Sequence, residues 1–263
     1  ITGINVSSLN DGELTYEITL TDTAGNTATA TDMIDKDTAL PGAPGMPDLI
    51  AADDSGSDNS DEITNVARPQ FDGGGAGASM TIVLFADTDT SGTFDDPGER
   101  IGSTTSDGSG NWSITPDADL PEGTYNVAAA EEDGAGNLSP FSGSLEITPD
   151  RTEPSGHSIA VDGDGQISAS EAMTTSLTFT SAEPTAEFDL TVTSDGGGTV
   201  TTPDGTISAA DEQISPIDVS GLSDGNLTYE VVLTDKAGNA ASPVTDGAAD
   251  LDQTAPAAPA MPN

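Results

Sequence analysis

Residues 160–171 read AVDGDGQISASE, and their carboxylates are spaced like the ligands of a calcium-binding EF-hand loop. Such a loop has oxygen ligands at positions 1, 3, 5, 9 and 12 and a glycine at position 6. Counted from its first residue, the stretch fills positions 3, 5, 12 and 6 with Asp162, Asp164, Glu171 and Gly165. Position 1 offers no ligand, and the flanks PSGHSIAV and TTSLTFTS alternate in polarity as strands do. The stretch therefore predicts a calcium loop between strands.

A second stretch of this kind is DTDTSGTFDDPGE at residues 87–99. Asp87, Asp89 and Asp95 fall at positions 1, 3 and 9, whereas Glu99 comes one position later than the EF-hand glutamate. A plain Asp-Gly hairpin turn uses the same residue types, so that alternative stays open for both stretches.

Two other acidic patterns supply candidate calcium ligands. The stretch DDSGSDNSDE holds acids that repel one another unless a cation lies among them, and its candidate ligands are Asp53, Asp54, Asp58 and Asp61; the alternative is a flexible acidic loop. An aspartate also opens each of the turns TDTAGN, DGAGN and TDKAGN, at Asp22, Asp133 and Asp235. The last two are candidate ligands, but an aspartate in such a turn commonly accepts hydrogen bonds from its own backbone.

Composition limits the functions that these acids can serve. The 263 residues include 46 acidic and 5 basic ones, for a formal net charge of −41, which excludes a nucleic-acid binder. Only 33 % of the residues are hydrophobic, and such a chain should not stay compact unaided. Because the apolar residues are nevertheless patterned, we expect Ca²⁺ to neutralise the acids. There is no cysteine for disulfides and no apolar run long enough for membrane insertion.

The sequence also repeats itself. Residues 1–26 match residues 214–239, and the proline-rich segments at 35–48 and 250–263 match each other. A weaker third copy begins with EGTYNVAAAEEDGAGN at 122–137. One period therefore holds two unequal units of roughly 100 residues each.

The polarity pattern within each unit is that of β-strands. In LTYEITL and LTYEVVL, apolar and polar residues alternate, which predicts half-buried strands, and turn residues punctuate the chain. We expect an all-β fold of tandem immunoglobulin-like antiparallel β-sandwiches with Greek-key connections in an extended array. The predicted domains are the C-terminal part of one at 1–38, whole ones at 39–151 and 152–253, and the start of another at 254–263.

Three segments resemble a known family. PDLIAADDSGSDNSDEITNVARPQF, TTSDGSGNWSITPDADLPEGTYNVAAAEEDGAGNLSPFSGSLEITPDRTEP and DVSGLSDGNLTYEVVLTDKAGNAA are similar to tandem bacterial Ig-like domains of giant surface adhesins, including extender regions of RTX adhesins. The resemblance implies sandwiches in series, stiffened by calcium at and between domains. It also implies calcium at the acids that precede the proline-rich junctions, namely Asp35, Asp37, Asp150, Asp250 and Asp252. A solvated linker stiffened by proline alone is the alternative.

Aromatic and nucleophilic residues offer little other chemistry. Trp112 could stack on a sugar, but we expect it in a sandwich core, and we expect Tyr16, Tyr125 and Tyr229 to form tyrosine corners. His157 is the single histidine, and nothing singles out a catalytic carboxylate pair, so we expect no enzyme.

The expected function is a calcium-stiffened spacer of a secreted bacterial surface adhesin, active in attachment or biofilm formation. Its partners would be neighbouring Ig-like domains of the same long chain. The alternatives are a subunit of an extracellular filament or surface layer, with other copies as partners, and a carbohydrate-binding module.

The first forty residues resemble only the last strands of the domain at 152–253. We expect three strands there, ITGINVSSL, ELTYEITLTD and NTATATDMI, with one apolar face that nothing in the segment covers. We expect the covering strands to come from a longer parent chain or from another copy, and the segment not to fold by itself. The unfinished domain after Gln253 favours the longer chain.

Overall fold

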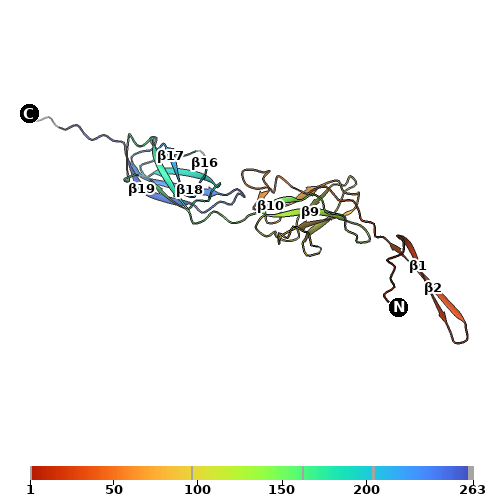
Figure 1. The fold of residues 1–263 in the computed structure, drawn as a ribbon. Helices are drawn as coiled ribbons and strands as arrows, with labels where there is room; N and C mark the ends of the chain where they lie inside the picture. The colour runs from red at the N-terminus through yellow and green to blue at the C-terminus, as the bar shows by residue number, and fades with distance from the viewer. Residues whose placement is uncertain (1, 96, 162, 203–204, 260–263) are drawn as a thin grey trace, which may run out of the picture. The chain divides into compact units, whose positions relative to one another are not determined.

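The computed structural model describes residues 2–95, 97–161, 163–202 and 205–259, and its regular structure is all β (Figure 1). No helix occurs within these ranges, which confirms the predicted fold class. The same residues contain no helix with the length and hydropathy that a membrane span requires.

The chain divides into two compact units. The first comprises Ile1–Ile50 and Arg68–Ile147, and the second comprises Ala51–Ala67 and Thr148–Asn263. The segment 51–67 therefore packs within the second unit, although the predicted domain at 39–151 includes it. The predicted domain boundaries themselves stay a prediction.

The first unit contains a sandwich of two antiparallel sheets. One sheet has the strand order β3 (Asp48–Leu49), β5 (Phe71–Gly73), β8 (Trp112–Ile114). The other has the antiparallel order β10 (Leu145–Pro149), β9 (Tyr125–Glu132), β6 (Thr81–Ala86), β7 (Arg100–Thr105), and the short strand β4 (Ile63–Thr64) pairs in parallel with the end of β10. The two sheets share one core, to which β5 contributes Phe71, β8 contributes Trp112 and β6 contributes Ile82 and Leu84.

Strand β6 is buried on both faces, which explains its unbroken apolar sequence TIVLFA. Val83 and Phe85 point away from the main core into a second cluster, with Phe94 and Phe141 packed against it. The Phe141 ring lies 5.0 Å from the rings of both Phe85 and Phe94, measured between centroids. The loop that follows β6 is thus fastened to the sheet through Phe94.

The second unit contains a similar sandwich. Its smaller sheet has the order β11 (Ser158–Val161), β13 (Thr175–Thr180), β17 (Glu212–Ile217). Its larger sheet has the order β12 (Gln166–Ser168), β19 (Val244–Asp252), β18 (Gly225–Thr234), β14 (Glu187–Ser194), β15 (Thr199–Thr201), and β16 (Gly205–Thr206) pairs with β14. The flanks of the EF-like stretch are thus β11 and the segment containing β13, as predicted.

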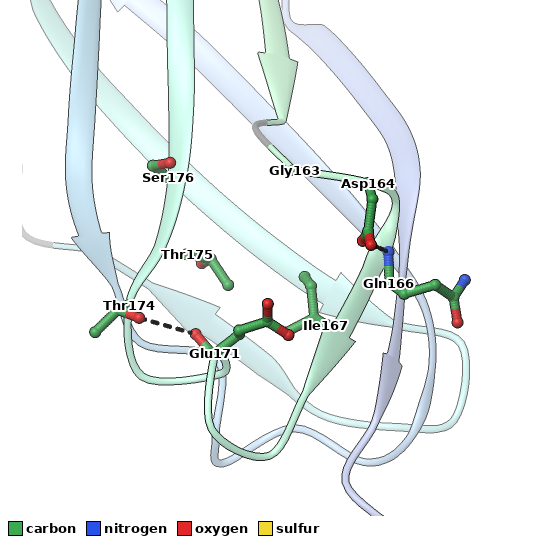
Figure 2. A pocket seen from close by; sticks show the side chains of 8 residues that line it. All are labelled: Gly163, Asp164, Gln166, Ile167, Glu171, Thr174, Thr175 and Ser176. Atoms are coloured by element: carbon green, nitrogen blue, oxygen red, sulfur yellow. Dashed lines mark hydrogen bonds between the residues drawn. The ribbon is translucent and has the colours of Figure 1, made fainter.

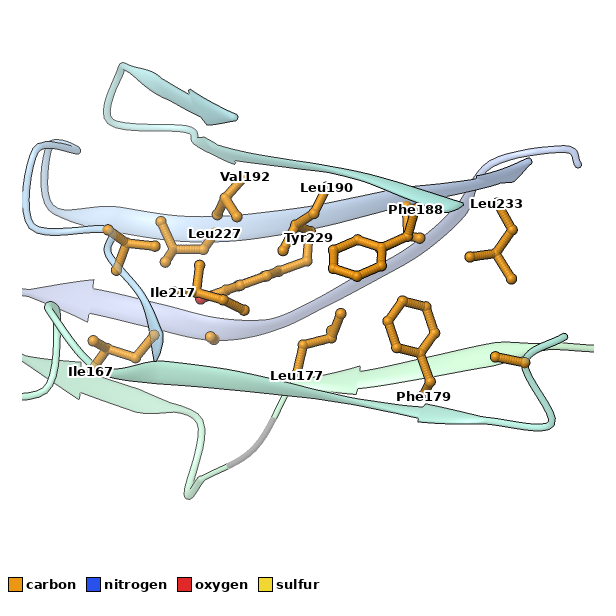
Figure 3. Close-up of a cluster of buried hydrophobic side chains, with 14 of the residues drawn as sticks. Ile167, Leu177, Phe179, Phe188, Leu190, Val192, Ile217, Leu227, Tyr229 and Leu233 are labelled. Atoms are coloured by element: carbon orange, nitrogen blue, oxygen red, sulfur yellow. The ribbon is translucent and has the colours of Figure 1, made fainter. Parts of the chain in front are cut away.

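The core of this unit follows the predicted alternation. Figure 3 shows side chains from both sheets meeting in one layer, including Leu177 and Phe179 from β13 and Tyr229 and Leu233 from β18. The rings of Phe179 and Phe188 lie 5.7 Å apart and join the two sheets. Alternate residues of β18 are buried because one face of the strand meets this layer.

The tyrosine-corner prediction is confirmed at Tyr125 and wrong at Tyr229. The Tyr125 hydroxyl donates to the Pro121 carbonyl oxygen at 3.1 Å, four residues upstream, because Tyr125 begins β9. Tyr229 lies in the interior of β18, where its hydroxyl instead donates to the Thr175 hydroxyl oxygen at 3.4 Å. It is therefore a core residue of the sandwich.

Strands β1 (Gly12–Thr21) and β2 (Thr27–Lys36) form a separate two-stranded sheet. Ile18 and Leu20 are 49 % and 70 % exposed, whereas their counterparts Val231 and Leu233 are fully buried. The predicted third strand is wrong, since residues 2–11 form no strand. The counterpart of residues 2–4 in the second unit is 215–217, the end of β17, which pairs with β13, and the described residues 2–40 hold no equivalent of β13.

We expect an isolated peptide of residues 1–40 to be unfolded, because a two-stranded sheet with an uncovered apolar face is marginal in water. Circular dichroism should show a random-coil spectrum, and the amides should exchange rapidly. A cooperative thermal transition in this peptide would show that the sheet is stable without a covering layer.

Candidate calcium sites

The loop between β6 and β7 brings three carboxylates together. Asp87 directly follows β6, and Glu99 directly precedes β7, so antiparallel pairing of the two strands places these residues side by side. One carboxylate oxygen from each of Asp87, Asp89 and Glu99 lies within 4.8 Å of the others. Among the described residues, this is the one such group of three.

The spacing of these oxygens suits a single calcium ion. Calcium binds oxygen at about 2.3–2.6 Å, so two ligands of one ion lie no more than about 5 Å apart. Asp87 is 3 % exposed and Glu99 is 9 % exposed, so neither carboxylate is well hydrated. Three negative charges at this separation repel strongly, and a divalent cation would remove that cost.

Backbone amides hold two of these carboxylates but leave one oxygen unsatisfied. The amides of Ser91 and Gly92 donate to the two Asp87 oxygens at 2.8 and 2.9 Å. The Asp95 amide donates to Glu99 Oε2 at 2.9 Å, while Glu99 Oε1 is buried without a hydrogen-bond partner. A buried unpaired carboxylate oxygen is costly, and a bound cation is one way to satisfy it.

Sequence position alone misplaces two residues of this loop. Glu99 falls outside the EF-hand spacing, yet hairpin pairing brings it into the group. Asp95 occupies an EF-hand ligand position, but its carboxylate lies outside the group of three. The Ser91 amide also donates to Asp89, and this hydrogen bond is the main reason that the pKa of Asp89 is lowered.

The loop at 53–62 contains another buried carboxylate. Asp54 is 5 % exposed, and its Oδ1 atom is buried without a hydrogen-bond partner. Its Oδ2 atom accepts a long hydrogen bond from the Glu62 amide, at 3.3 Å. Burial raises the pKa of Asp54 above its ordinary value, and the charges of Asp61 and Asp58 raise it further.

The neighbouring acids of this loop make local turns. Asp58 Oδ1 accepts a hydrogen bond from the Ser60 hydroxyl at 2.7 Å, and Asp61 Oδ1 accepts one from the Ile63 amide at 3.2 Å. The backbone carbonyl of Asp53 accepts the Thr64 hydroxyl. Asp58 and Asp61 are near enough to Asp54 to affect its pKa, so this loop collects negative charge around the unsatisfied oxygen.

The EF-like stretch forms an open hollow of about 420 Å³, shown in Figure 2, with Asp164 and Glu171 among the residues that line it. The carboxylate of Asp164 accepts the Gln166 amide at 3.0 Å, and that of Glu171 accepts the Ser168 hydroxyl at 2.7 Å, which lowers the Glu171 pKa. Asp162 lies outside the described residues. The assignment of this loop as a calcium site stays a prediction.

The aspartates of the three Asp-x-Ala-Gly-Asn turns bind their own backbone, as the alternative interpretation predicted. Asp22, Asp133 and Asp235 each accept the backbone amide of the turn asparagine at 2.8 Å and its side-chain amide at 2.8 Å. These bonds hold the pKa values of Asp22 and Asp133 below the usual range. The bonds give each aspartate a structural role.

Strand register brings the junction acids next to the acidic loops. In the parallel pairing of β12 with β19, Gln166 lies opposite Asp250 and Ser168 lies opposite Asp252. Strand β4 (Ile63–Thr64) pairs in the same way with the end of β10, where the Asp150 amide donates to the Thr64 carbonyl oxygen at 2.8 Å. Clusters that are separate in sequence therefore adjoin in space.

The remaining junction acids lie on or after β2. Asp35 lies directly opposite Glu13 in the β1–β2 ladder, where like charges repel. The Asp37 carboxylate accepts the Ala39 amide at 2.9 Å, and its backbone carbonyl accepts the Asn137 side-chain amide at 3.1 Å. A role for either residue as a calcium ligand stays a prediction.

Glu183 is an acid near a junction that sequence patterns did not indicate. Burial raises its pKa, and the charges of Asp235 and Asp150 raise it further. It lies in the segment between β13 and β14, far in sequence from both partners. No spacing rule could have found it, because only the fold brings these acids together.

Residues 41–151 match the model of the bacterial Ig-like domain. Comparison with curated protein sequences gives no match.

The solved structures that are similar to the chain include a repeat of a large adhesion protein and two further adhesins. One is a tetra-tandem repeat in the extending region of a large adhesion protein, with 25 % identity over 97 % of this chain and 60 % of that one, and a TM-score of 0.38. A second is a Ca²⁺-stabilised adhesin of an Antarctic bacterium that binds ice, with 20 % identity over 92 % of this chain and 57 % of that one, and a TM-score of 0.40. A third is a bacterial ice-binding adhesin, with 19 % identity over 93 % of this chain and 76 % of that one, and a TM-score of 0.39. The chain thus spans about three fifths of the length of the first two structures.

The family match spans the sandwich of the first unit, from β3 to β10, together with the acidic loop at 53–62. The β6–β7 loop, with its three carboxylates, also lies within the match. Residues 41–151 are therefore similar to the bacterial Ig-like domain family.

Proposed function

We propose that this chain is a calcium-stiffened spacer of a secreted bacterial surface adhesin. It would act in cell attachment or biofilm formation, and its direct partners would be neighbouring Ig-like domains of the same long chain. The repeats, the family match and the charge of −41 all support a structural array outside the cell that depends on cations.

The observation that carries the calcium part is the group formed by Asp87, Asp89 and Glu99. These carboxylates converge, Asp87 and Glu99 are buried, and one Glu99 oxygen has no hydrogen-bond partner. Asp54 supports a second site in the same way, and Asp164 with Glu171 a third.

The energy available from calcium matches the need of such a chain. Extracellular calcium modules bind with dissociation constants of about 0.1–1 mM. At tenfold excess calcium, one site adds roughly 1.4 kcal/mol to the free energy of unfolding. Three or four sites would approach the lower end of a domain's whole stability, about 5 kcal/mol. Calcium would then replace the disulfides that the sequence cannot form.

Two other functions are alternatives. A carbohydrate-binding module needs an exposed aromatic platform, but Trp112, Tyr125 and Tyr229 are all at least nine-tenths buried. An extracellular filament or surface layer would use the same sandwiches with other copies as partners, and an image of the intact assembly would distinguish it from an adhesin. We propose no enzymatic activity.

Calcium removal tests the proposal. A chelator should lower the melting temperature of the whole chain, and calcium should restore it, because the converging carboxylates lose their counterion. Glu99→Gln should reduce this calcium-dependent shift, as measured by calorimetry at constant ionic strength.

The matched control is Glu146→Gln, which removes one exposed charge from β10. It should leave the calcium-dependent shift unchanged. If the chelator does not alter melting or protease resistance, calcium does not stabilise this protein.

Asp54→Asn should have opposite effects with and without calcium. Without the ion, the amide removes a buried unpaired charge, so the variant should melt at a higher temperature than the wild type. With calcium, the variant should lose part of the calcium-dependent gain because one ligand is gone. Asp119→Asn, on an exposed loop, should show neither effect.

The pH dependence of the ion-free protein has a defined sign at Asp54. Burial raises the folded-state pKa above the ordinary value of 3.8, so folding favours the protonated acid. That stabilisation is complete below about pH 3.8 and is lost as the pH rises through the folded-state pKa. The difference in stability between wild type and Asp54→Asn should follow this curve; a constant difference across the range would contradict it.

A junction variant tests stiffness. Asp150→Ala should loosen the joint between the Ig-like domains more than it destabilises either domain, and Asp250→Ala combined with Asp252→Ala should do the same at the next joint. X-ray scattering should show a broadened distance distribution, which Asp119→Ala should not produce. Unchanged flexibility would assign the stiffness to proline and packing.

A further inference from the structure

The turn Asp-x-Ala-Gly-Asn occurs three times, at 22–26, 133–137 and 235–239, with the same internal structure each time. In each copy, the glycine amide donates to the carbonyl oxygen of the aspartate at 3.1 Å. The glycine has a positive φ, of 90° at Gly25 and 88° at both Gly136 and Gly238. The three turns therefore have the same local structure at three different places in the chain.

One of these turns has a partner segment pressed against it within the second unit. The Ser55 hydroxyl donates to the Ala237 carbonyl oxygen at 2.6 Å. A Cβ atom placed on Gly56 would lie 1.9 Å from the Lys236 carbonyl oxygen. Position 56 therefore accepts no side chain while the turn is in place.

The partner segment and the turn each make a further hydrogen bond. The Asn65 amide donates to Ser55 Oγ at 2.7 Å, so the same hydroxyl binds both the turn and the segment. The side-chain amide of Asn239 donates to the Asp150 carbonyl oxygen at 3.0 Å, which ties the turn to the end of β10. The contact therefore consists of hydrogen bonds from the Ser55 hydroxyl and the Asn239 side-chain amide to backbone carbonyls, together with close backbone packing at Gly56.

The other two copies of the turn have open space at the equivalent position. In the described part of the chain, no atom lies within 4 Å of a Cβ atom placed on Gly25 or Gly136. A Cβ atom placed on Gly238 would lie 3.1 Å from the Gly56 amide nitrogen. The turn is thus the same in all three copies, whereas the docked segment is found at one.

We propose that this turn is a docking element between Ig-like domains, and that its receptor is a Ser-Gly segment within an acidic loop such as 51–67. Recognition depends on shape and on hydrogen bonds to the turn backbone, and Asp150, a candidate calcium ligand, takes part only through its backbone carbonyl oxygen. The copies at 22–26 and 133–137 are surfaces for the same kind of loop from another Ig-like domain. This inference goes beyond the calcium proposal and does not require it.

The position of Lys236 allows a direct test on the whole chain. Lys36 and Lys236 are the only lysines in the sequence, so a lysine-specific endoprotease can cut at two places. The Lys236 side chain is exposed, but the segment at 55–56 covers the carbonyl oxygens on both sides of residue 237. Cleavage after Lys236 should therefore report undocking, and cleavage after Lys36 should serve as an internal reference.

Gly56→Ala and Ser55→Ala should each speed cleavage after Lys236 by about tenfold or more, as expected for a lost hydrogen bond or a steric clash, with cleavage after Lys36 unchanged. Gly136→Ala is the matched control, because it carries the same backbone strain in open space, and it should change neither rate. Fragment masses give both rates from one digest, in calcium and in chelator.

Three results would overturn the inference. One is rapid cleavage after Lys236 in the wild type with calcium. Another is an equal effect of Gly136→Ala, which would indicate general destabilisation. The third combines two observations: the wild type is cleaved rapidly after Lys236 in chelator, and both variants are cleaved as slowly as the wild type in calcium. That result would show that calcium, and not the contact of Ser55 and Gly56 with the turn, holds the segment. If chelator leaves melting unchanged but the variants still speed cleavage, the calcium proposal fails and the docking element stands.

Discussion

Burial of carboxylate oxygens without hydrogen-bond partners is the constraint on which this structure depends. Asp54 and Glu99 each place an oxygen where neither water nor a protein donor reaches it. In a chain with a net charge of −41, such oxygens also lie in a strongly negative field. Their burial is costly unless a proton or a cation compensates the charge, and a hard divalent cation suits clustered carboxylates.

The chain handles its other acids in a different way. Asp22, Asp133 and Asp235 accept hydrogen bonds from their own turns, so each charge stabilises a local backbone conformation. The distinction is physical: hydrogen bonds from their own turns lower the pKa values of Asp22 and Asp133, whereas burial, with the charges of Asp61 and Asp58, raises the pKa of Asp54. Acidic residues of the same type thus have two roles in this protein.

The acidic loops and the junctions form one structural feature. In each sandwich, a short strand that follows an acidic loop pairs in parallel with the last long strand, just before a proline-rich segment. The loop, the junction acid and the final strand are therefore coupled by the sheet. An ion bound in the loop, or a turn docked against it, would act directly on the point where one domain leads into the next.

The sequence by itself determined the all-β fold, the repeat and the acidic loops, because alternation and turn residues are local properties. It also predicted the burial of Trp112 and the tyrosine corner at Tyr125. Only the tertiary structure decided that Glu99 joins Asp87, that Asp54 is buried and that Glu183 lies near Asp150. Those facts depend on strand pairing between distant segments, which fixes which carboxylates meet and which lose their water.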